Sequence, residues 1–292
     1  MSVMMKRRKF ITMLGGASAW PLAARAQQAP PLIGFLNGAS PAGYAPYVAA
    51  FRQGLKEAGY VESQNVTIEY RWAENEYDRL PALAADLVRR NVVVIAATST
   101  PAAQAAKALT STVPIVFTTG DDPIKLGLVA SFNRPGGNAT GVSHLIGELG
   151  SKRLGLLREL LPGITVITTL LNPNFPGAER QLRDAEAAAG ALGIQLIVLR
   201  ASTEREIDAA FATMAQQGTS ALVVGGDPFF IARREQIVAL AARHAIPTIY
   251  PARDFAVAGG LSLDYELWNR LCGCVSPSGR LHRPNCQGRE TG

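Results

Sequence analysis

Cysteine is scarce in this chain and unevenly placed: Cys272, Cys274 and Cys286 all fall in the last 21 residues. Residues 27–265 therefore offer no thiol nucleophile and no disulfide. Histidine is nearly as rare, since only His144 and His244 occur in that body. No run of 18 apolar residues is present, which excludes an ordinary transmembrane helix. With 48% hydrophobic and 18% charged residues, the composition is that of a folded globular protein rather than of a disordered chain.

Positive charge is concentrated at the two ends of the chain. Of the net charge of +6, residues 1–26 carry +5 and residues 266–292 carry +2, which leaves the body at −1. A nearly neutral body has no basic face for phosphates, so we expect no nucleic-acid partner. The glycine-rich segment 136–141 does not open a helix after a strand, and it predicts a turn rather than a phosphate loop. We expect no catalytic residue, no metal and no cofactor, since metal-ligand spacing is also missing from the body.

The first 26 residues have the layout of a signal peptide. A basic start, Lys6 to Lys9, is followed by a weakly apolar stretch and then by small residues before Gln27. We therefore expect export to the bacterial periplasm with cleavage after Ala26. The pair Arg7 and Arg8, one residue before Phe10, resembles a twin-arginine signal. A Sec signal with a chance arginine pair is the alternative.

Apolar periodicity predicts strands that alternate with amphipathic helices, which is typical of parallel sheets covered on both faces. In the first half the strands are predicted at 32–36, 66–70, 92–97 and 114–117, and the helices at 48–58, 80–88 and 101–109. In the second half the strands are predicted at 164–171, 194–199, 221–225 and 246–250, and the helices at 178–192, 207–214 and 231–244.

The second half repeats the first. Asn37 and Asn172 each close the first strand of a half, and VPIVF at 113–117 is echoed by IPTIY at 246–250. We therefore predict two doubly wound α/β lobes joined by a hinge. The lobes span 30–140 and 153–261, and a crossing lies between them at 141–152.

Ligands of parallel sheets bind beyond the carboxyl ends of the strands, and the loops there are rich in small polar residues. Thr98, Ser99 and Thr100 precede Pro101 at a predicted helix start, where backbone N–H groups favour an anion. Asp121, Asp122 and Asp227 could receive an ammonium group, so the set suggests a zwitterion site. Helix caps and turn residues are the simpler interpretation of each residue taken alone.

Several long segments resemble the periplasmic substrate-binding proteins of ABC transporters, and more narrowly the branch related to tryptophan and aromatic amino-acid binding proteins. The segments that carry the resemblance are IGFLNGASP, FRQGLKEAGYVESQNVTIEYRWAE, YDRLPALAADLV, VPIVFTTGDDPIKLGLVASFNRPGGNATGV and DPFFIARREQIVALAARHAIPTIYPARDFAVAGG.

The resemblance implies a type I periplasmic-binding-protein fold that passes a small organic ligand, such as an amino acid, to an ABC permease at the inner membrane. We expect a monomer, and we expect no enzyme because no nucleophile or acid pair is found. The alternatives are an exported α/β enzyme and a ligand-sensing domain without a role in transport. The cleft residues that it implies are Asn37, Ser40, Thr98, Ser99, Thr100, Thr119, Asp121, Asn172 and Asp227.

Residues 262–292 do not continue the family pattern, and we expect them to be disordered. The family usually continues with a segment of the form SYGT…DAYR…AGVYTG…KGEKP. Codons permitted from Glu266 onward, read one base later, allow that segment over more than twenty positions. A frameshift between Leu261 and Glu266 is therefore our interpretation. A zinc site formed by Cys272, Cys274, His282 and Cys286 is the weaker alternative.

Overall fold

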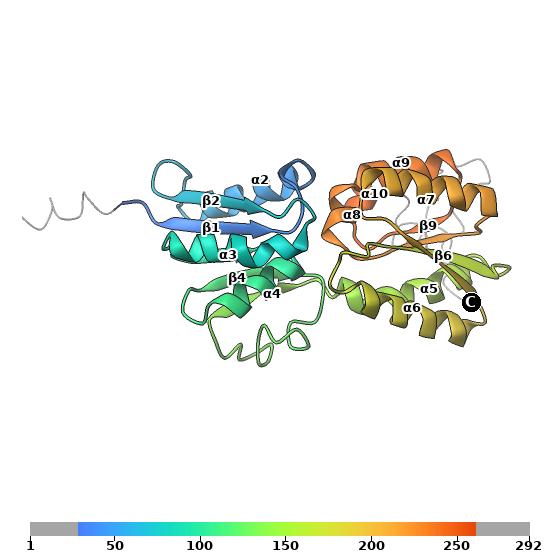
Figure 1. The fold of residues 1–292 in the computed structure, drawn as a ribbon, viewed down its shortest axis with the longest axis horizontal. Helices are drawn as coiled ribbons and strands as arrows, with labels where there is room; N and C mark the ends of the chain where they lie inside the picture. Colours follow the sequence, from blue (N-terminus) through green and yellow to red (C-terminus); the bar gives the residue numbers. More distant parts are fainter. Residues whose placement is uncertain (1–28, 261–292) are drawn as a thin grey trace, which may run out of the picture.

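The computed structural model describes residues 29–260, which form two lobes lying side by side (Figure 1). The first lobe has a parallel sheet of order β2-β1-β3-β4-β5, and the second has a parallel sheet of order β7-β6-β8-β9. The strands are β1 Leu32–Asn37, β2 Thr67–Trp72, β3 Val94–Ala97, β4 Ile115–Thr119, β5 Ala139–Ser143, β6 Val166–Leu171, β7 Gln195–Arg200, β8 Leu222–Val224 and β9 Thr248–Ile249. Matching β1–β4 to β6–β9 gives the same strand order in both lobes, which confirms the predicted repeat.

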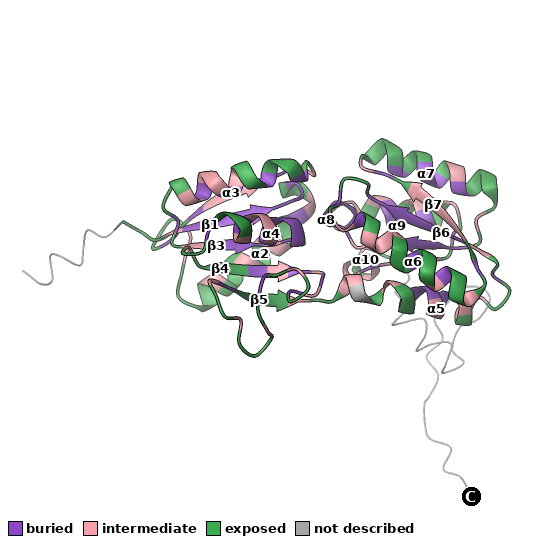
Figure 2. Cartoon of the chain, turned by 60° about the horizontal axis from the view of Figure 1, so that its bottom comes forward, coloured by how far each residue is buried: buried purple, intermediate pink, exposed green. Residues whose placement is uncertain are grey.

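Helices cover both faces of each sheet, so the strands are largely buried while the outer helix faces are exposed (Figure 2). The helices are α2 Pro41–Glu57, α3 Leu80–Arg89, α4 Thr100–Leu109, α5 Gly150–Leu160, α6 Ala178–Leu192, α7 Glu204–Gln217, α8 Pro228–Ala232, α9 Arg234–Arg243 and α10 Asp254–Val257, with 3₁₀ turns η1 Tyr77–Arg79 and η2 Ile146–Leu149. Between residues 29 and 260, no helix is both long and apolar enough to cross a membrane.

Local sequence signals account for where helices α3, α6 and α7 begin, end and face. The apolar residues of α3 recur on one face, and Leu80, Ala84 and Leu87 are buried there against the sheet. Helix α7 starts with a capping box formed by Thr203 and Glu206. Helices α6 and α7 each end at a glycine with positive φ, the conformation that glycine adopts without steric cost.

Strand β5 differs from the prediction, which placed a turn at 136–141 and the crossing at 141–152. Residues 139–143 instead pair with β4 as the outer strand of the first sheet. The strand was missed because it is short, mostly exposed and contains Gly141. A Cβ at Gly141 would overlap Phe117 of β4, so glycine permits the close approach of the two strands.

The second lobe begins earlier than predicted. Helix α5 starts at Gly150, inside the predicted crossing, and buries Leu154 and Leu157 in a core of the second lobe. The single helix predicted at 231–244 is two helices, because Arg233 leaves helical geometry between α8 and α9. The start of α8 is fixed by its N-cap, Asp227, whose carboxylate accepts the Phe230 N–H.

Candidate functional site

The two lobes meet at the carboxyl ends of their strands, where the chain is unusually polar for a buried region. Of the nine predicted site residues, eight are buried and Thr98 is partly buried. Seven lie at strand ends or helix starts in the first lobe, while Asn172 and Asp227 follow β6 and β8 in the second. Since buried polar groups need hydrogen-bond partners, the partners of each residue define what the site can do.

In the first lobe, Asn37 and Ser99 tie the ends of β1 and β3 together. The amide of Asn37 donates to the carbonyl oxygen of Thr98 at 3.0 Å and to its Oγ1 at 2.8 Å. The Ser99 hydroxyl accepts from the N–H of Gly38 at 3.2 Å and from that of Ala102 at 3.4 Å. Ser99 is thus the N-cap of α4, and Asn37 orients the loop that faces the second lobe.

An acidic side chain of the chain itself lies beside the start of α4. Thr100, the first residue of that helix, donates from Oγ1 to Asp121 at 3.0 Å and lies 2.7 Å from Thr119 Oγ1. The positive end of the helix dipole therefore already faces a carboxylate. Asp122 has a different role, since its carboxylate accepts the Ile124 N–H at 2.8 Å in a local turn.

Asp227 joins the two lobes. Its Oδ2 accepts from the Tyr77 hydroxyl of the first lobe at 2.9 Å and from the Asn172 amide at 3.3 Å. Burial raises the pKa of Asp227 from 3.8 to about 6, although these hydrogen bonds favour the charged form. The ring of Tyr77 also meets Phe175 of the second lobe edge to face, with centroids 6.1 Å apart. An acid and an aromatic pair thus lie together at the boundary.

Three more cross-lobe contacts surround this centre. Arg180 of α6 forms an ion pair with Asp121. Arg234 of α9 donates to the backbone oxygen of Gly43 at 3.1 Å. A Cβ at Gly43 would overlap Ala232, so the backbones of α2 and α8 approach closely. Because the two lobes are in direct contact at these positions, the structure is that of the closed state.

Sequence reasoning missed Tyr77, Phe175, Arg180 and Arg234. Each lies in a segment that reads as an ordinary helix face or turn, and nothing in the spacing shows which lobe it faces. The sequence signal for a site residue was a small polar residue at the carboxyl end of a predicted strand. None of these four residues has that position.

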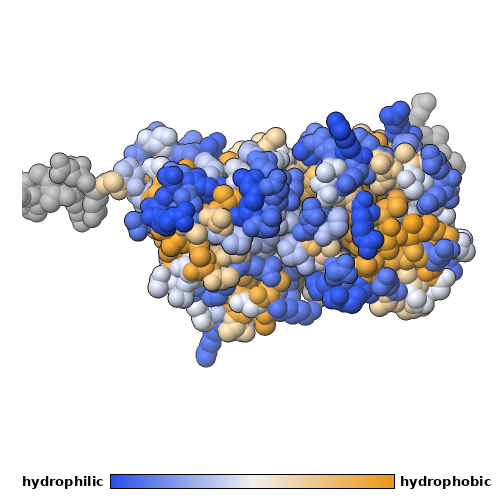
Figure 3. Space-filling model, in the orientation of Figure 1, coloured by the Kyte–Doolittle hydropathy of each residue, from blue (hydrophilic) through white to orange (hydrophobic). Residues whose placement is uncertain are grey.

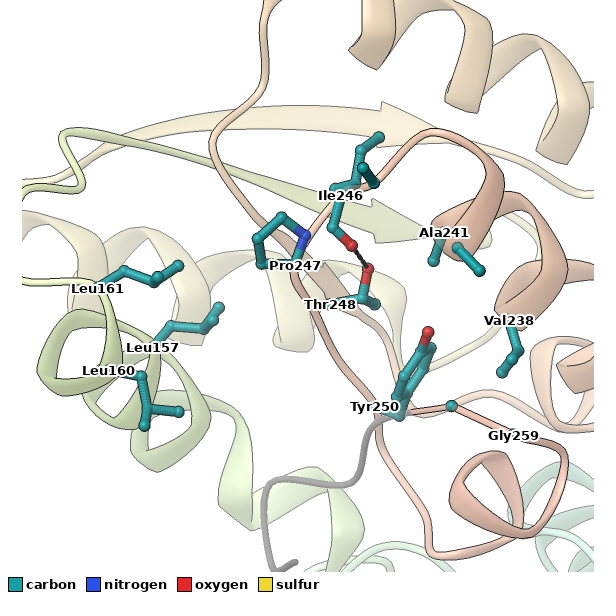
Figure 4. Close-up of a pocket in the computed structure, with 13 residues that line it drawn as sticks. Leu157, Leu160, Leu161, Val238, Ala241, Ile246, Pro247, Thr248, Tyr250 and Gly259 are labelled. Carbon is teal, nitrogen blue, oxygen red and sulfur yellow. Dashed lines mark hydrogen bonds between the residues drawn. The ribbon is translucent and has the colours of Figure 1, made fainter. Parts of the chain in front are cut away.

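An apolar cavity of about 440 Å³ lies away from the boundary, in the second lobe (Figure 4). Leucines of α5 line one side, and Val238, Ala241 and Tyr250 line the other. Figure 3 shows hydrophobic side chains gathered on this lobe over α5 and β6. A cavity of about 30 Å³ near the boundary touches Arg153, whose burial lowers its pKa to about 10.

Of the two histidines weighed for other chemistry, His144 lies next to this centre, since its backbone N–H donates to the Thr119 oxygen at 2.9 Å, whereas His244 lies away from it. His244 stacks near Phe211 in the second lobe, with ring centroids 6.3 Å apart, and His144 is exposed. Across residues 29–260, no three His, Cys, Asp or Glu side chains gather as metal ligands would. Cys272, Cys274, His282 and Cys286 lie outside the described residues, as do the predicted signal peptide and the segment 262–292.

Comparison with known proteins finds one curated relative and several solved structures with a similar fold. A tyrosine-binding protein of Clostridioides difficile (strain R20291) is 27% identical over 219 residues, which is 74% of this chain and 63% of that protein. The chain thus matches less than two thirds of the length of this curated relative. The fold matches a conserved domain protein of Vibrio cholerae O1 biovar El Tor N16961 with a TM-score of 0.68 and 23% identity, over 87% of this chain and 88% of the other.

A second solved structure with the same fold is an ABC domain of Streptococcus pneumoniae in complex with L-Trp. Its TM-score is 0.64 at 22% identity, over 87% of this chain and 88% of the other. These likenesses confirm the predicted type I periplasmic-binding-protein fold. Residues 40–263 match the family described as ABC transporter substrate binding protein. The chain therefore belongs to the family of ABC transporter substrate-binding proteins.

Proposed function

We propose that this chain is the extracytoplasmic solute receptor of an ABC importer and binds a small organic ligand, an amino acid, between its lobes. The observation that carries the proposal is the boundary itself, where strand-end residues of both lobes form one buried polar centre. In type I folds such a boundary opens and closes around a ligand. Its partners are then the ligand and a permease at the inner membrane, and the receptor is a monomer.

The ligand contacts are proposed to come from the nine strand-end residues. They are Asn37, Ser40, Thr98, Ser99, Thr100, Thr119, Asp121, Asn172 and Asp227. The relatives support an amino acid as ligand, because one is named a tyrosine-binding protein and another was solved with L-Trp. The proposal includes export with cleavage after Ala26 and binding without turnover, with no cofactor or metal.

A thermal-shift screen of the purified mature chain with the twenty standard amino acids and related small acids tests this function. A true ligand stabilises by about 2.7 kcal/mol at a hundredfold excess over its Kd. Asp227→Asn should weaken that stabilisation, and Glu186→Gln, at an exposed position on α6, should leave it unchanged. Chromatography of the same mixtures detects turnover. Product formation from any hit would favour the enzyme alternative, and saturable stabilisation without product supports the receptor.

A further inference from the structure

Asp121 and Arg180 form an ion pair that joins the two lobes. Asp121 follows β4 in the first lobe, and Arg180 lies in the first turn of α6 in the second. Among the side chains that the structure describes, no other ion pair crosses the boundary: the remaining pairs, such as Arg71 with Asp86, each lie within one lobe. A charge of each sign is thus presented on opposite walls of the same boundary.

The surroundings of the pair differ at its two ends. The Asp121 side chain is only 8% exposed and accepts a hydrogen bond from Thr100 at the start of α4. The Arg180 side chain is 33% exposed and has a second, weaker partner in Asp184 at 3.6 Å. Asp121 is therefore held in place by its own lobe, while Arg180 is more exposed and has one carboxylate partner in each lobe.

Gly147, in the segment between the lobes, leaves room beside the pair. A Cβ there would overlap the Asp121 carboxylate and would lie 2.9 Å from Nη2 of Arg180. The backbone of η2 thus runs directly beside both charges, and no side chain from it separates them. Parting of the lobes exposes both charges to whatever enters the boundary.

We infer that Arg180 binds the carboxylate of the ligand and Asp121 binds its ammonium group, so that the receptor selects α-amino acids over simple amines and simple acids. This inference rests on the proposed function. An α-amino acid carries both charges on one carbon, and its insertion replaces one ion pair by two. An amine or an acid alone leaves one partly buried protein charge without a partner, which is costly.

The other groups that could hold a carboxylate are already engaged. The start of α4 faces the Asp121 carboxylate, which would repel a second anion there. Arg153 donates to the backbone oxygens of Ile146 in η2 and of Val224 in the second lobe. Arg180 differs from these groups, because its partner across the boundary is a carboxylate. A ligand carboxylate can take the place of that partner.

Isothermal titration with matched ligand sets tests the inference. The probes are L-tyrosine with tyramine and 3-(4-hydroxyphenyl)propionate, and L-leucine with isoamylamine and 4-methylpentanoate. The wild-type chain should bind the amino acid of at least one set about 10- to 100-fold more tightly than its amine or acid. Arg180→Gln should bind the amino acid about 10- to 100-fold more weakly than wild type, with binding of the amine unchanged or tighter. Asp121→Asn should weaken binding of the amino acid by a similar factor, with binding of the acid unchanged.

The controls separate recognition of the ligand from closure of the lobes. Arg180→Lys, which keeps the charge, should restore part of the preference for the amino acid over the amine, and Glu186→Gln should behave as wild type. Circular dichroism and melting without ligand verify that each variant folds. Equal weakening of amino acid and amine in Arg180→Gln would show that the pair only closes the lobes and would overturn the inference. Tight binding of acids or uncharged molecules alone would overturn it while leaving a receptor, whereas no binding of any small molecule would also refute the proposed function.

Discussion

The hydroxyl group of Tyr77 donates a 2.9 Å hydrogen bond to Oδ2 of Asp227, 150 residues further along the chain. One residue belongs to the first lobe and the other to the second, so the contact exists only when the lobes are closed. It lies beside Asn172, which donates to the same oxygen. The carboxylate is buried by both lobes at once, which makes its protonation a property of the closed state.

The first prediction concerns the pH dependence of stability. Burial raises the pKa of Asp227 to about 6 from 3.8, so the folded chain keeps this proton at pH values where the unfolded chain has lost it. Stability contributed by the protonated group is therefore present below pH 4 and is lost as the pH rises to about 6, by on the order of 3 kcal/mol. Asp227→Asn should lack this loss in urea unfolding between pH 4 and 6.

Tyr77→Phe should strengthen the pH dependence that Asp227→Asn removes. The Tyr77 hydrogen bond lowers the pKa of Asp227, so its removal should raise that pKa further and extend the loss of stability to higher pH. The difference from wild type isolates Asp227 from other carboxylates, such as Asp86, whose pKa is lowered by Arg71. Identical pH profiles for wild type and Asp227→Asn would show that Asp227 titrates normally.

The second prediction concerns lobe closure at Gly43. A Cβ there would overlap Ala232 of α8, including its backbone, so Gly43→Ala should hold the lobes apart and weaken ligand binding by about tenfold or more. Gly54→Ala is the matched control on the same helix, because a Cβ at Gly54 meets nothing within 4 Å. That control should keep affinity and gain up to about 1 kcal/mol of stability.

Small-angle scattering with and without ligand distinguishes the two glycine variants. Gly43→Ala should keep a larger radius of gyration than wild type when ligand is present, while Gly54→Ala should contract normally. A normal contraction of Gly43→Ala would mean that α2 and α8 can separate without opening the lobes.

The third prediction concerns the apolar cavity of about 440 Å³ between α5 and α9, which Gly259 and Gly260 line where the described chain ends. A chain with the reading frame restored after Leu261 should be more stable than the chain as written, because its continuation would cover this surface. At about 25 cal/mol per Å², covering a few hundred Å² contributes on the order of 10 kcal/mol. Urea unfolding and binding of a hydrophobic dye measure the difference.

A chain ending at Gly260 is the control for that comparison. If residues 261–292 contribute nothing, the shortened chain should equal the chain as written in stability and dye binding. Lower stability of the shortened chain would show that the written tail packs on the lobe. Resequencing of the locus tests the frame directly.

The fourth prediction concerns export. Replacing Arg7 and Arg8 by lysine should leave the precursor in the cytoplasm if the twin-arginine route is used. Cell fractionation with immunodetection measures this, and replacing Lys6 and Lys9 by arginine serves as the charge-preserving control. Normal periplasmic accumulation of the lysine variant would point to Sec export.

The sequence by itself determined the alternation of strands and helices, because each element buries a periodic apolar face that can be read residue by residue. It also determined the repeat, since Asn37 is the last residue of β1 and Asn172 directly follows the equivalent strand β6. The predicted site residues could be chosen once the strands were predicted, because the carboxyl ends of parallel strands share one edge of a sheet. Strand β5 was not predicted, because it has no periodic apolar face and its Gly141 is required by the close approach to Phe117, which only the structure shows.

Only the tertiary structure decided which residues of the two lobes meet. Tyr77 and Asp227, like Asp121 and Arg180, are partners because the lobes close in one orientation, and that orientation depends on close contacts such as Gly43 against Ala232. Local propensity carries no information about such pairs, since each partner satisfies the rules of its own turn or helix. The fold therefore followed from burial along the chain, whereas the charges that meet across the lobe boundary followed from packing between distant segments.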